Sequence, residues 1–84
     1  MSKLLVEVLT PGNGKTYEFR IDGGISGLKA KQKIIEQILE VEAGGITLNP
    51  EKCLLFHIKS GKKLSNGLAL SAQSIRSGST LLLV

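Results

Sequence analysis

Tryptophan is absent from this sequence of 84 residues, aromatic residues make up only 4% of it, and cysteine occurs once, as Cys53. A single cysteine forms neither an internal disulfide nor a multi-thiolate metal site, so the fold must depend on apolar packing. The scarcity of aromatic rings argues against binding of single-stranded nucleic acid, which stacks its bases on exposed aromatic side chains. We therefore expect no metal, no cofactor and no nucleic-acid partner.

Long hydrophobic runs are absent as well. No window approaches the roughly 18 consecutive apolar residues of a membrane-spanning helix, and Met1–Lys3 leads into a strand-like segment without the features of a signal peptide. Eleven Lys and Arg against seven Asp and Glu give a net charge of only +4, short of the clustered charge of a dedicated nucleic-acid binder. These features predict a cytoplasmic protein without an integral membrane segment.

The length predicts a single domain, residues 1–84, because single hydrophobic cores usually organise about 100 to 200 residues. A chain this short buries only roughly 60 to 65% of its unfolded surface, so a deep catalytic cleft would compete with the core for the same side chains. We therefore expect a monomeric binding protein rather than an enzyme.

Two segments of alternating polarity, Lys3–Leu9 and Lys15–Asp22, flank the turn-forming sequence Pro11–Gly14. Alternation with a period of two is typical of strands with one buried face, and a short turn between two such strands favours an antiparallel hairpin. The side chains expected to face the core are Leu4, Val6, Val8, Tyr17, Phe19 and Ile21.

The period changes to about 3.6 residues over Leu28–Glu42, which predicts the one helix of the chain. The hydroxyl of Ser26 is suited to cap its first turn, and Gly44–Gly45 is suited to end it in the left-handed conformation. The apolar stripe expected to face the core comprises Ala30, Ile34, Ile35, Ile38, Leu39 and Val41.

Three lysines, Lys29, Lys31 and Lys33, lie near the start of this helix. The helix dipole disfavours cations at that end, so they are not there for helix stability. We expect them to form a solvated face, and the alternative is a basic docking surface.

A short apolar segment, Cys53–Lys59, is followed by the Ser60–Gly61 turn and is predicted to form a third strand. Hydrophobic burial favours the more apolar of its two alternate sets as the inward one. The inward set is then Leu54, Phe56 and Ile58, and the outward set is Cys53, Leu55 and His57.

The last third of the chain is predicted to be irregular over Gly61–Leu70 and to form a short helical turn over Ser71–Ile75, capped by Ser71. Thr80–Val84 is predicted to be the final strand. If Leu81 and Leu83 fill the core, alternation exposes the residues between and after them. The residues expected on this open sheet face are Leu82 and Val84, beside Leu5 or Leu9.

Two constellations resemble chemical sites, and neither is assigned a reaction. Gly12–Thr16 imitates the end of a phosphate-binding loop, but Leu9 replaces the required upstream glycine and a strand follows where a helix is needed. A hairpin turn explains the segment. Cys53 and His57 lie about 13 Å apart along one strand, too far to share a metal or to form a nucleophile–base pair.

The stretch Gly61–Val84, GKKLSNGLALSAQSIRSGSTLLLV, resembles the corresponding part of ubiquitin without a gap. The shared positions are Gly61, Lys62, Leu64, Gly67, Leu70, Ser71, Ile75, most of Ser79–Leu81, Leu83 and Val84. With the hairpin–helix order, the resemblance implies the β-grasp fold. This is an α+β domain with a β-hairpin, one α-helix across a mixed sheet, two further main strands and a short helical turn.

Within that superfamily, EVLTP at Glu7–Pro11, KTYEFRI at Lys15–Ile21, IKSGKxL at Ile58–Leu64 and the terminal LLLV resemble small bacterial ubiquitin-like proteins of the YukD and EsaB kind. Those proteins are associated with type VII secretion loci. The resemblance implies an accessory or regulator of a bacterial type VII secretion system, with a protein partner from that system.

The β-grasp arrangement also brings the turn after the third strand and the loop before the last strand to one end of the sheet. Four basic residues would then converge and attract an acidic partner. The predicted partner-binding residues are Leu82, Val84, Lys59, Lys62, Lys63 and Arg76.

Conjugation and sulfur transfer by ubiquitin-like proteins require a tail that ends in Gly-Gly, whereas this sequence stops at Val84. Its two Gly-Gly pairs, Gly23–Gly24 and Gly44–Gly45, flank the helix and are explained by backbone geometry. We therefore expect a protein-binding module that is not conjugated, and the alternative is a ubiquitin-like modifier or sulfur carrier.

Overall fold

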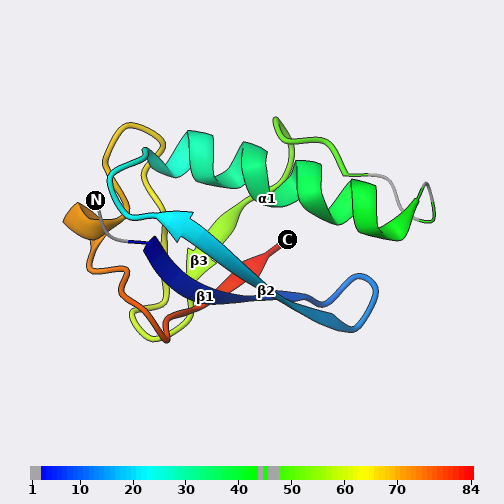
Figure 1. Cartoon of the computed structure of the whole chain (residues 1–84), viewed down its shortest axis with the longest axis horizontal. Coiled ribbons are helices and arrows are strands. Elements are labelled where there is room, and N and C mark those ends of the chain that lie inside the picture. Colours follow the sequence, from blue (N-terminus) through cyan, green and yellow to red (C-terminus); the bar gives the residue numbers. More distant parts are fainter. Residues whose placement is uncertain (1–2, 44, 46–47) are drawn as a thin grey trace.

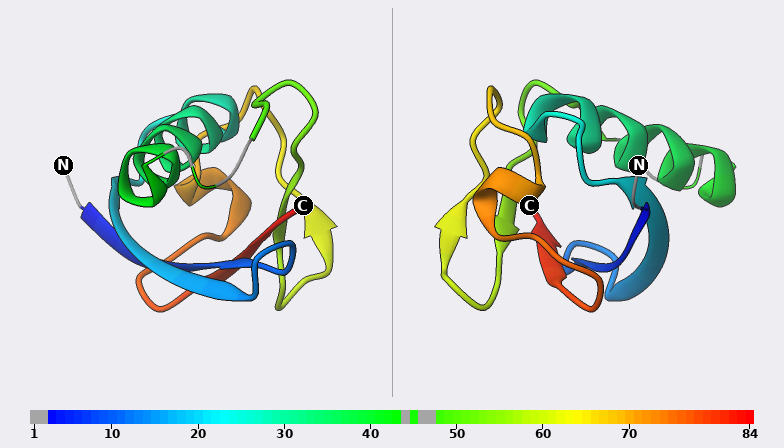
Figure 2. Two further views of the ribbon diagram at one scale, coloured as in Figure 1. Left: turned by 90° about the vertical axis from the view of Figure 1, so that its right-hand side faces the viewer. Right: turned by 60° about the vertical axis from the view of Figure 1, so that its left-hand side comes forward.

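A computed structural model describes residues 3–43, 45 and 48–84. In chain order its elements are β1 (Lys3–Thr10), β2 (Lys15–Asp22), α1 (Gly27–Glu42), β3 (Leu55–His57), β4 (Lys62–Lys63), the 3-10 helix η1 (Ser71–Gln73) and β5 (Thr80–Leu83). α1 lies across one face of the sheet and leaves the opposite face open (Figure 1, Figure 2). This is the predicted α+β arrangement.

The sheet has five strands in the order β2-β1-β5-β3-β4. β1 and β2 form an antiparallel hairpin, β5 runs parallel to β1, and β3 pairs antiparallel with both β5 and β4. A parallel pair requires a long crossover connection, and α1 lies within the connection from β1 to β5. The predicted mixed sheet is therefore confirmed.

The predicted hairpin turns at Pro11–Gly14. Gly14 adopts φ +68°, a left-handed conformation that glycine reaches without steric cost. Asn13 Oδ1 accepts a hydrogen bond from the Lys15 backbone N–H at 3.1 Å. The predicted facing of both strands is also confirmed: Val6, Val8, Phe19 and Ile21 are buried, and Leu4 and Tyr17 pack against the core.

The predicted cap of α1 is confirmed, but its end differs from the prediction. Ser26 Oγ accepts a hydrogen bond from the Lys29 N–H at 3.2 Å. After the helix, Ala43 adopts the left-handed conformation (φ 50°, ψ 43°) and donates its N–H to the Leu39 carbonyl at 3.1 Å. The left-handed cap is thus at Ala43 rather than at the predicted Gly44–Gly45, whose first glycine lies outside the described residues.

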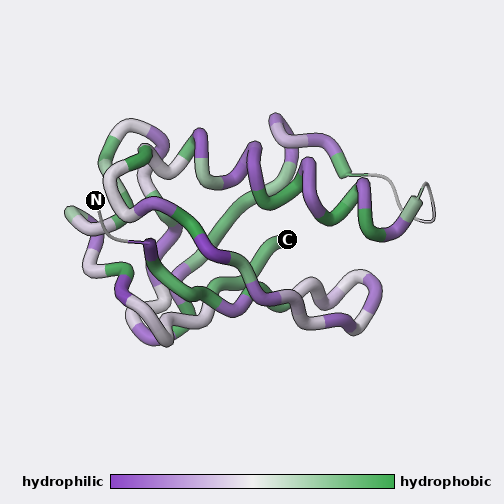
Figure 3. The backbone as a smooth tube through the Cα atoms, viewed as in Figure 1, coloured by the Kyte–Doolittle hydropathy of each residue, from purple (hydrophilic) through white to green (hydrophobic). Residues whose placement is uncertain are grey.

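The apolar stripe of α1 faces the sheet (Figure 3). Its buried members are Ala30, Ile34, Ile35 and Ile38, and Leu39 is partly buried. Val41, predicted to belong to the stripe, is 70% exposed. The last turn of α1 extends past the apolar core, and its contact with the hairpin is polar: Glu42 accepts hydrogen bonds from Lys15 Nζ at 2.9 Å and Tyr17 Oη at 2.7 Å.

β3 is shorter than predicted and faces the opposite way. Leu55 and His57 are buried, Phe56 is half-buried, and Leu54 and Ile58 are exposed. The set that we predicted to be inward is therefore the outward one.

Pairing with β5 causes this reversal. Leu55 pairs with Leu83, and His57 pairs with Leu81. Directly paired residues lie on the same face of a sheet, and both β5 leucines are buried in the core, as predicted. The register with β5, rather than the hydrophobicity of β3, determines which side of β3 is buried.

Two further details of the last third differ from the prediction. Lys62–Lys63 form the edge strand β4, where an irregular segment was expected. Ser71 does not cap η1, because the capping position is Leu70, which makes no side-chain hydrogen bond, and the Ser71 N–H donates to the Gly23 carbonyl at 3.0 Å. This last bond ties η1 to the segment before α1.

Candidate functional site

The sheet face that α1 leaves open carries an apolar patch. Leu82 of β5 is half-buried and pairs with Leu9 of β1 on one side and Phe56 of β3 on the other. Val84 is 51% exposed and exchanges two backbone hydrogen bonds with Leu54, at 2.7 and 2.9 Å. The open-face patch comprises Leu9, Leu54, Phe56, Ile58, Leu82 and Val84.

The open-face patch contains both apolar residues that the sequence predicted to lie there, Leu82 and Val84. Of the two β1 leucines considered, Leu9 pairs directly with Leu82, whereas Leu5, which is 44% exposed on the same face, lies before the part of β1 that pairs with β5. The three patch residues from β3 and its flanks were expected in the core. Strand register is the signal that identifies them, and no local pattern of the sequence contains it.

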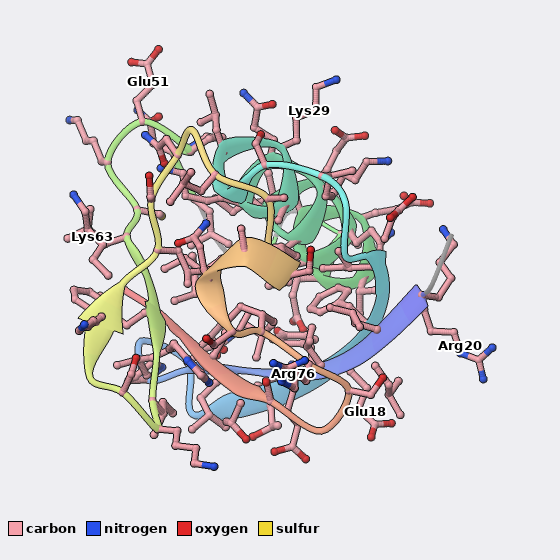
Figure 4. All side chains as sticks on the ribbon, turned by 90° about the vertical axis from the view of Figure 1, so that its left-hand side faces the viewer. Glu18, Arg20, Lys29, Glu51, Lys63 and Arg76 are labelled. Atoms are coloured by element: carbon pink, nitrogen blue, oxygen red, sulfur yellow. The ribbon has the colours of Figure 1, made fainter. Side chains whose placement is uncertain are left out.

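The four basic residues predicted to bind a partner line one groove beside the patch. Lys59, Lys62 and Lys63 come from the β3–β4 hairpin, and Arg76 comes from the segment between η1 and β5 (Figure 4). The groove has a volume of about 1040 Å³ and shares Ile58 with the open-face patch. We call it the basic groove, and it is lined by residues 57–60, 62–64, 68, 72–74 and 76–80.

The lysines of α1 do not form a common surface. Lys29 and Lys33 are exposed, as expected of a solvated face, but Lys31 is only 7% exposed. The prediction is wrong for Lys31 because its stem lies at the margin of the apolar stripe, and its Nζ donates to the Cys53 carbonyl at 3.1 Å. A docking surface built from all three lysines, which was the alternative, would therefore lack Lys31.

The other residues that the sequence suggested for chemistry have structural roles instead. His57 is buried, with its Nδ1 3.4 Å from Ser60 Oγ, and Cys53 is half-buried against the core, as expected of a small apolar residue. In Gly12–Thr16, β2 begins at Lys15, so the segment is the predicted hairpin turn. Within residues 3–43, 45 and 48–84, no three His, Cys, Asp or Glu side chains are grouped so that they could hold a metal ion.

No helix in the described part of the chain combines the length and the apolar character needed to span a bilayer.

The chain matches no protein-family model and no curated protein, but many solved structures are similar to it. The N-terminal ubiquitin-like domain of the 4931431F19Rik protein is 25% identical, with a TM-score of 0.78 over 100% of this chain and 76% of that one. The UBL domain of Plasmodium falciparum Dsk2 is 22% identical, with a TM-score of 0.78 over 98% and 96% of the two chains. Caldiarchaeum subterraneum ubiquitin is 14% identical, with a TM-score of 0.76 over 98% and 91%.

These similarities agree with the strand order and the single helix described above. The chain therefore has the ubiquitin-like β-grasp fold, with one helix and a mixed five-stranded sheet. The fold predicted from the resemblance to ubiquitin is confirmed.

Proposed function

We propose that this chain is a non-enzymatic module that binds a partner protein through the open-face patch and the basic residues beside it. The observation that carries the proposal is the continuity of the patch. Leu9, Leu82 and Phe56 are direct neighbours on three adjacent strands, on the sheet face that lies away from α1. Contiguous exposed apolar surface with a polar rim is typical of protein-binding sites.

The partner in this proposal is a component of a bacterial type VII secretion system, for which the chain acts as a cytoplasmic accessory or regulator. The support is the resemblance of four segments to YukD-like and EsaB-like proteins. One of them, Ile58–Leu64, begins in the open-face patch and forms one side of the basic groove. The resemblance thus includes the surface that we propose to bind.

The alternative function is that of a ubiquitin-like modifier or sulfur carrier. Its support is the shared fold with Caldiarchaeum subterraneum ubiquitin. The Gly-Gly pairs of the printed sequence flank α1, where Gly23 is buried and the Gly24 N–H bonds to Asp22 Oδ1 at 2.8 Å. We expect no adenylate or thioester when the chain is incubated with ATP and an activating enzyme of its host, and formation of either favours the alternative.

A calorimetric titration tests the leading proposal. The chain is titrated with the cytoplasmic part of the type VII secretion ATPase from the same host. The Leu82→Ser/Val84→Ser variant should bind with a Kd about tenfold or more above that of the wild type, because it makes the centre of the patch polar. The control, Leu28→Ser/Val41→Ser, makes the same kind of change at residues of α1 that are 39% and 70% exposed and should bind normally.

The outcomes separate the two parts of the proposal. If the wild-type chain does not bind the ATPase, the secretion partner is wrong. If it binds and the patch variant binds equally well while remaining folded, the docking face is wrong.

A further inference from the structure

We propose that the basic groove beside the open-face patch takes an extended acidic segment with an aliphatic side chain from a partner protein. Four of the eleven Lys and Arg residues line this groove, whereas none of the seven Asp and Glu residues does. In the described part of the chain the salt bridge found is Lys15–Glu42, so the groove cations make no ion pair there. Like charges gathered in a concave surface strengthen the local potential and attract groups of opposite charge.

The side of the groove formed by the β3–β4 hairpin is held by backbone hydrogen bonds. The Gly61 N–H donates to the His57 carbonyl at 2.8 Å, and Gly61 adopts φ +70°. The Lys62 N–H donates to Ser60 Oγ at 3.3 Å. These bonds fix the direction in which the turn presents its lysines.

The opposite side of the groove, between η1 and β5, is joined to β1 by hydrogen bonds. Arg76 and Ser79 are joined by two hydrogen bonds, from the Arg76 N–H to Ser79 Oγ and from the Ser79 N–H to the Arg76 carbonyl, both at 2.9 Å. The Gly78 N–H donates to the Leu5 carbonyl at 2.8 Å, and the Leu5 N–H donates to Ser77 Oγ at 3.1 Å. Both sides are therefore formed before any ligand arrives, which reduces the ordering cost of binding.

The lining favours a peptide over nucleic acid. Lys and Arg provide charge-assisted hydrogen bonds to carboxylates, and Leu68 and Ile58, which are 52% and 43% exposed, offer contact to an aliphatic side chain. Trp, Tyr and Phe are missing from the lining, so nucleobases find no stacking platform there. A volume of about 1040 Å³ suits a short extended segment rather than a folded domain.

The inference rests on the proposed protein-binding function but not on the open-face patch or on the secretion partner. The test uses the full chain and a fluorescein-labelled octapeptide of six glutamates with two central leucines, followed by fluorescence anisotropy. Lys62→Glu/Arg76→Glu should raise the peptide Kd about tenfold or more, because it reverses two groove charges. Lys29→Glu/Lys52→Glu makes the same change of net charge at exposed residues outside the groove and should raise it less than about threefold.

Two further measurements locate the binding. The Leu82→Ser/Val84→Ser variant should bind the octapeptide as the wild type does, since neither residue lines the groove. Amide chemical shifts should change mainly at residues 57–64 and 72–80 when the peptide is added. Thermal unfolding of each variant confirms that the domain is folded.

Several results overturn the inference. Equal loss of affinity in the two charge-reversal variants indicates general attraction by net charge, and absent binding at millimolar peptide rules out the site. Tighter binding of an octathymidylate in the same groove identifies nucleic acid as its ligand. If only the peptide result fails while the patch variant still impairs the ATPase complex, the groove proposal falls and the proposed binding through the open-face patch stands.

Discussion

The two faces of β5 place nearly identical side chains in opposite surroundings. Leu81 and Leu83 lie beneath α1 and are 0% and 3% exposed, whereas Val84 on the open face is 51% exposed and Leu82 is half-buried. Hydropathy does not distinguish them, because residues 81–84 are all aliphatic and the chain is coloured hydrophobic up to its C-terminus (Figure 3). What differs is the layer that covers each face, so the covered face contributes folding free energy and the open face is available to a partner.

Truncation of β5 on its two faces gives the largest expected difference. Leu81→Ala leaves a cavity in the core and should lower the free energy of unfolding by about 2 to 5 kcal/mol. Leu82→Ala should cost about 1 kcal/mol or less, because its side chain is only half-buried, on the open face, and its loss leaves no enclosed cavity. Urea denaturation of both variants measures the difference, and the reverse order would show that the strand faces the other way.

Packing on the covered side is also tight at the start of α1. A Cβ at Gly27 would lie 2.1 Å from the Ser65 carbonyl oxygen, so Gly27→Ala should destabilise the fold by about 1 to 3 kcal/mol. In an open helix position the same change is stabilising. Gly12→Ala, where no atom lies within 4 Å, is the control and should be nearly neutral. A gain in melting temperature for Gly27→Ala would contradict the packing described here.

Two lysines of α1 differ in the same way, because Lys31 is buried and Lys33 is exposed. Lys31→Ala removes the hydrogen bond to the Cys53 carbonyl and the packing of a buried stem, so it should cost about 1 to 3 kcal/mol. Lys33→Ala, on the exposed side of the same helix, should stay within about 0.5 kcal/mol of the wild type. Chemical denaturation distinguishes the two, and equal effects would mean that Lys31 is solvated.

The smallest expected effect on stability concerns the polar contact of Glu42 with Lys15 and Tyr17, beyond the apolar core. The hydrogen bond from Lys15, and then that from Tyr17, lowers the pKa of Glu42 below its ordinary value of 4.5. A lowered folded-state pKa adds stability that is present above the unfolded-state pKa and is lost as the pH falls through the folded-state pKa. The stability difference between wild type and Glu42→Gln should therefore shrink as the pH falls below about 4.5. A difference that stays constant with pH would exclude this linkage.

The long elements were predictable because each repeats its pattern over many residues. β1 and β2 have eight residues each, and a slip by one position would expose their entire apolar set. Helix α1 carries a recognisable capping residue, Ser26. For β5, the facing followed only once Leu81 and Leu83 were taken as core residues, because side chains alternate between the two faces of a strand.

The short elements depend on contacts that the local sequence does not contain. β3 has three residues with apolar side chains on both faces, so only its register with β5 determines which face is buried. β4 exists because Lys62–Lys63 pair with β3, and the burial of Lys31 depends on a carbonyl 22 residues away. The residues of the candidate site also differ in whether the local sequence could predict them. Leu82, Val84 and the basic residues could be predicted from the sequence, whereas Leu54, Phe56 and Ile58 could not.

The face of the sheet that α1 covers holds the apolar core, and we propose that the open face binds a partner. A methyl NMR titration of the Ile, Leu and Val side chains with the secretion ATPase fragment reports on both faces in one experiment. We expect large shifts or broadening at Leu9, Ile58, Leu82 and Val84, with little change at Val8 and Leu81. Perturbations centred instead on Leu28 and Val41 of α1, with the open-face methyls unchanged, would contradict this proposal.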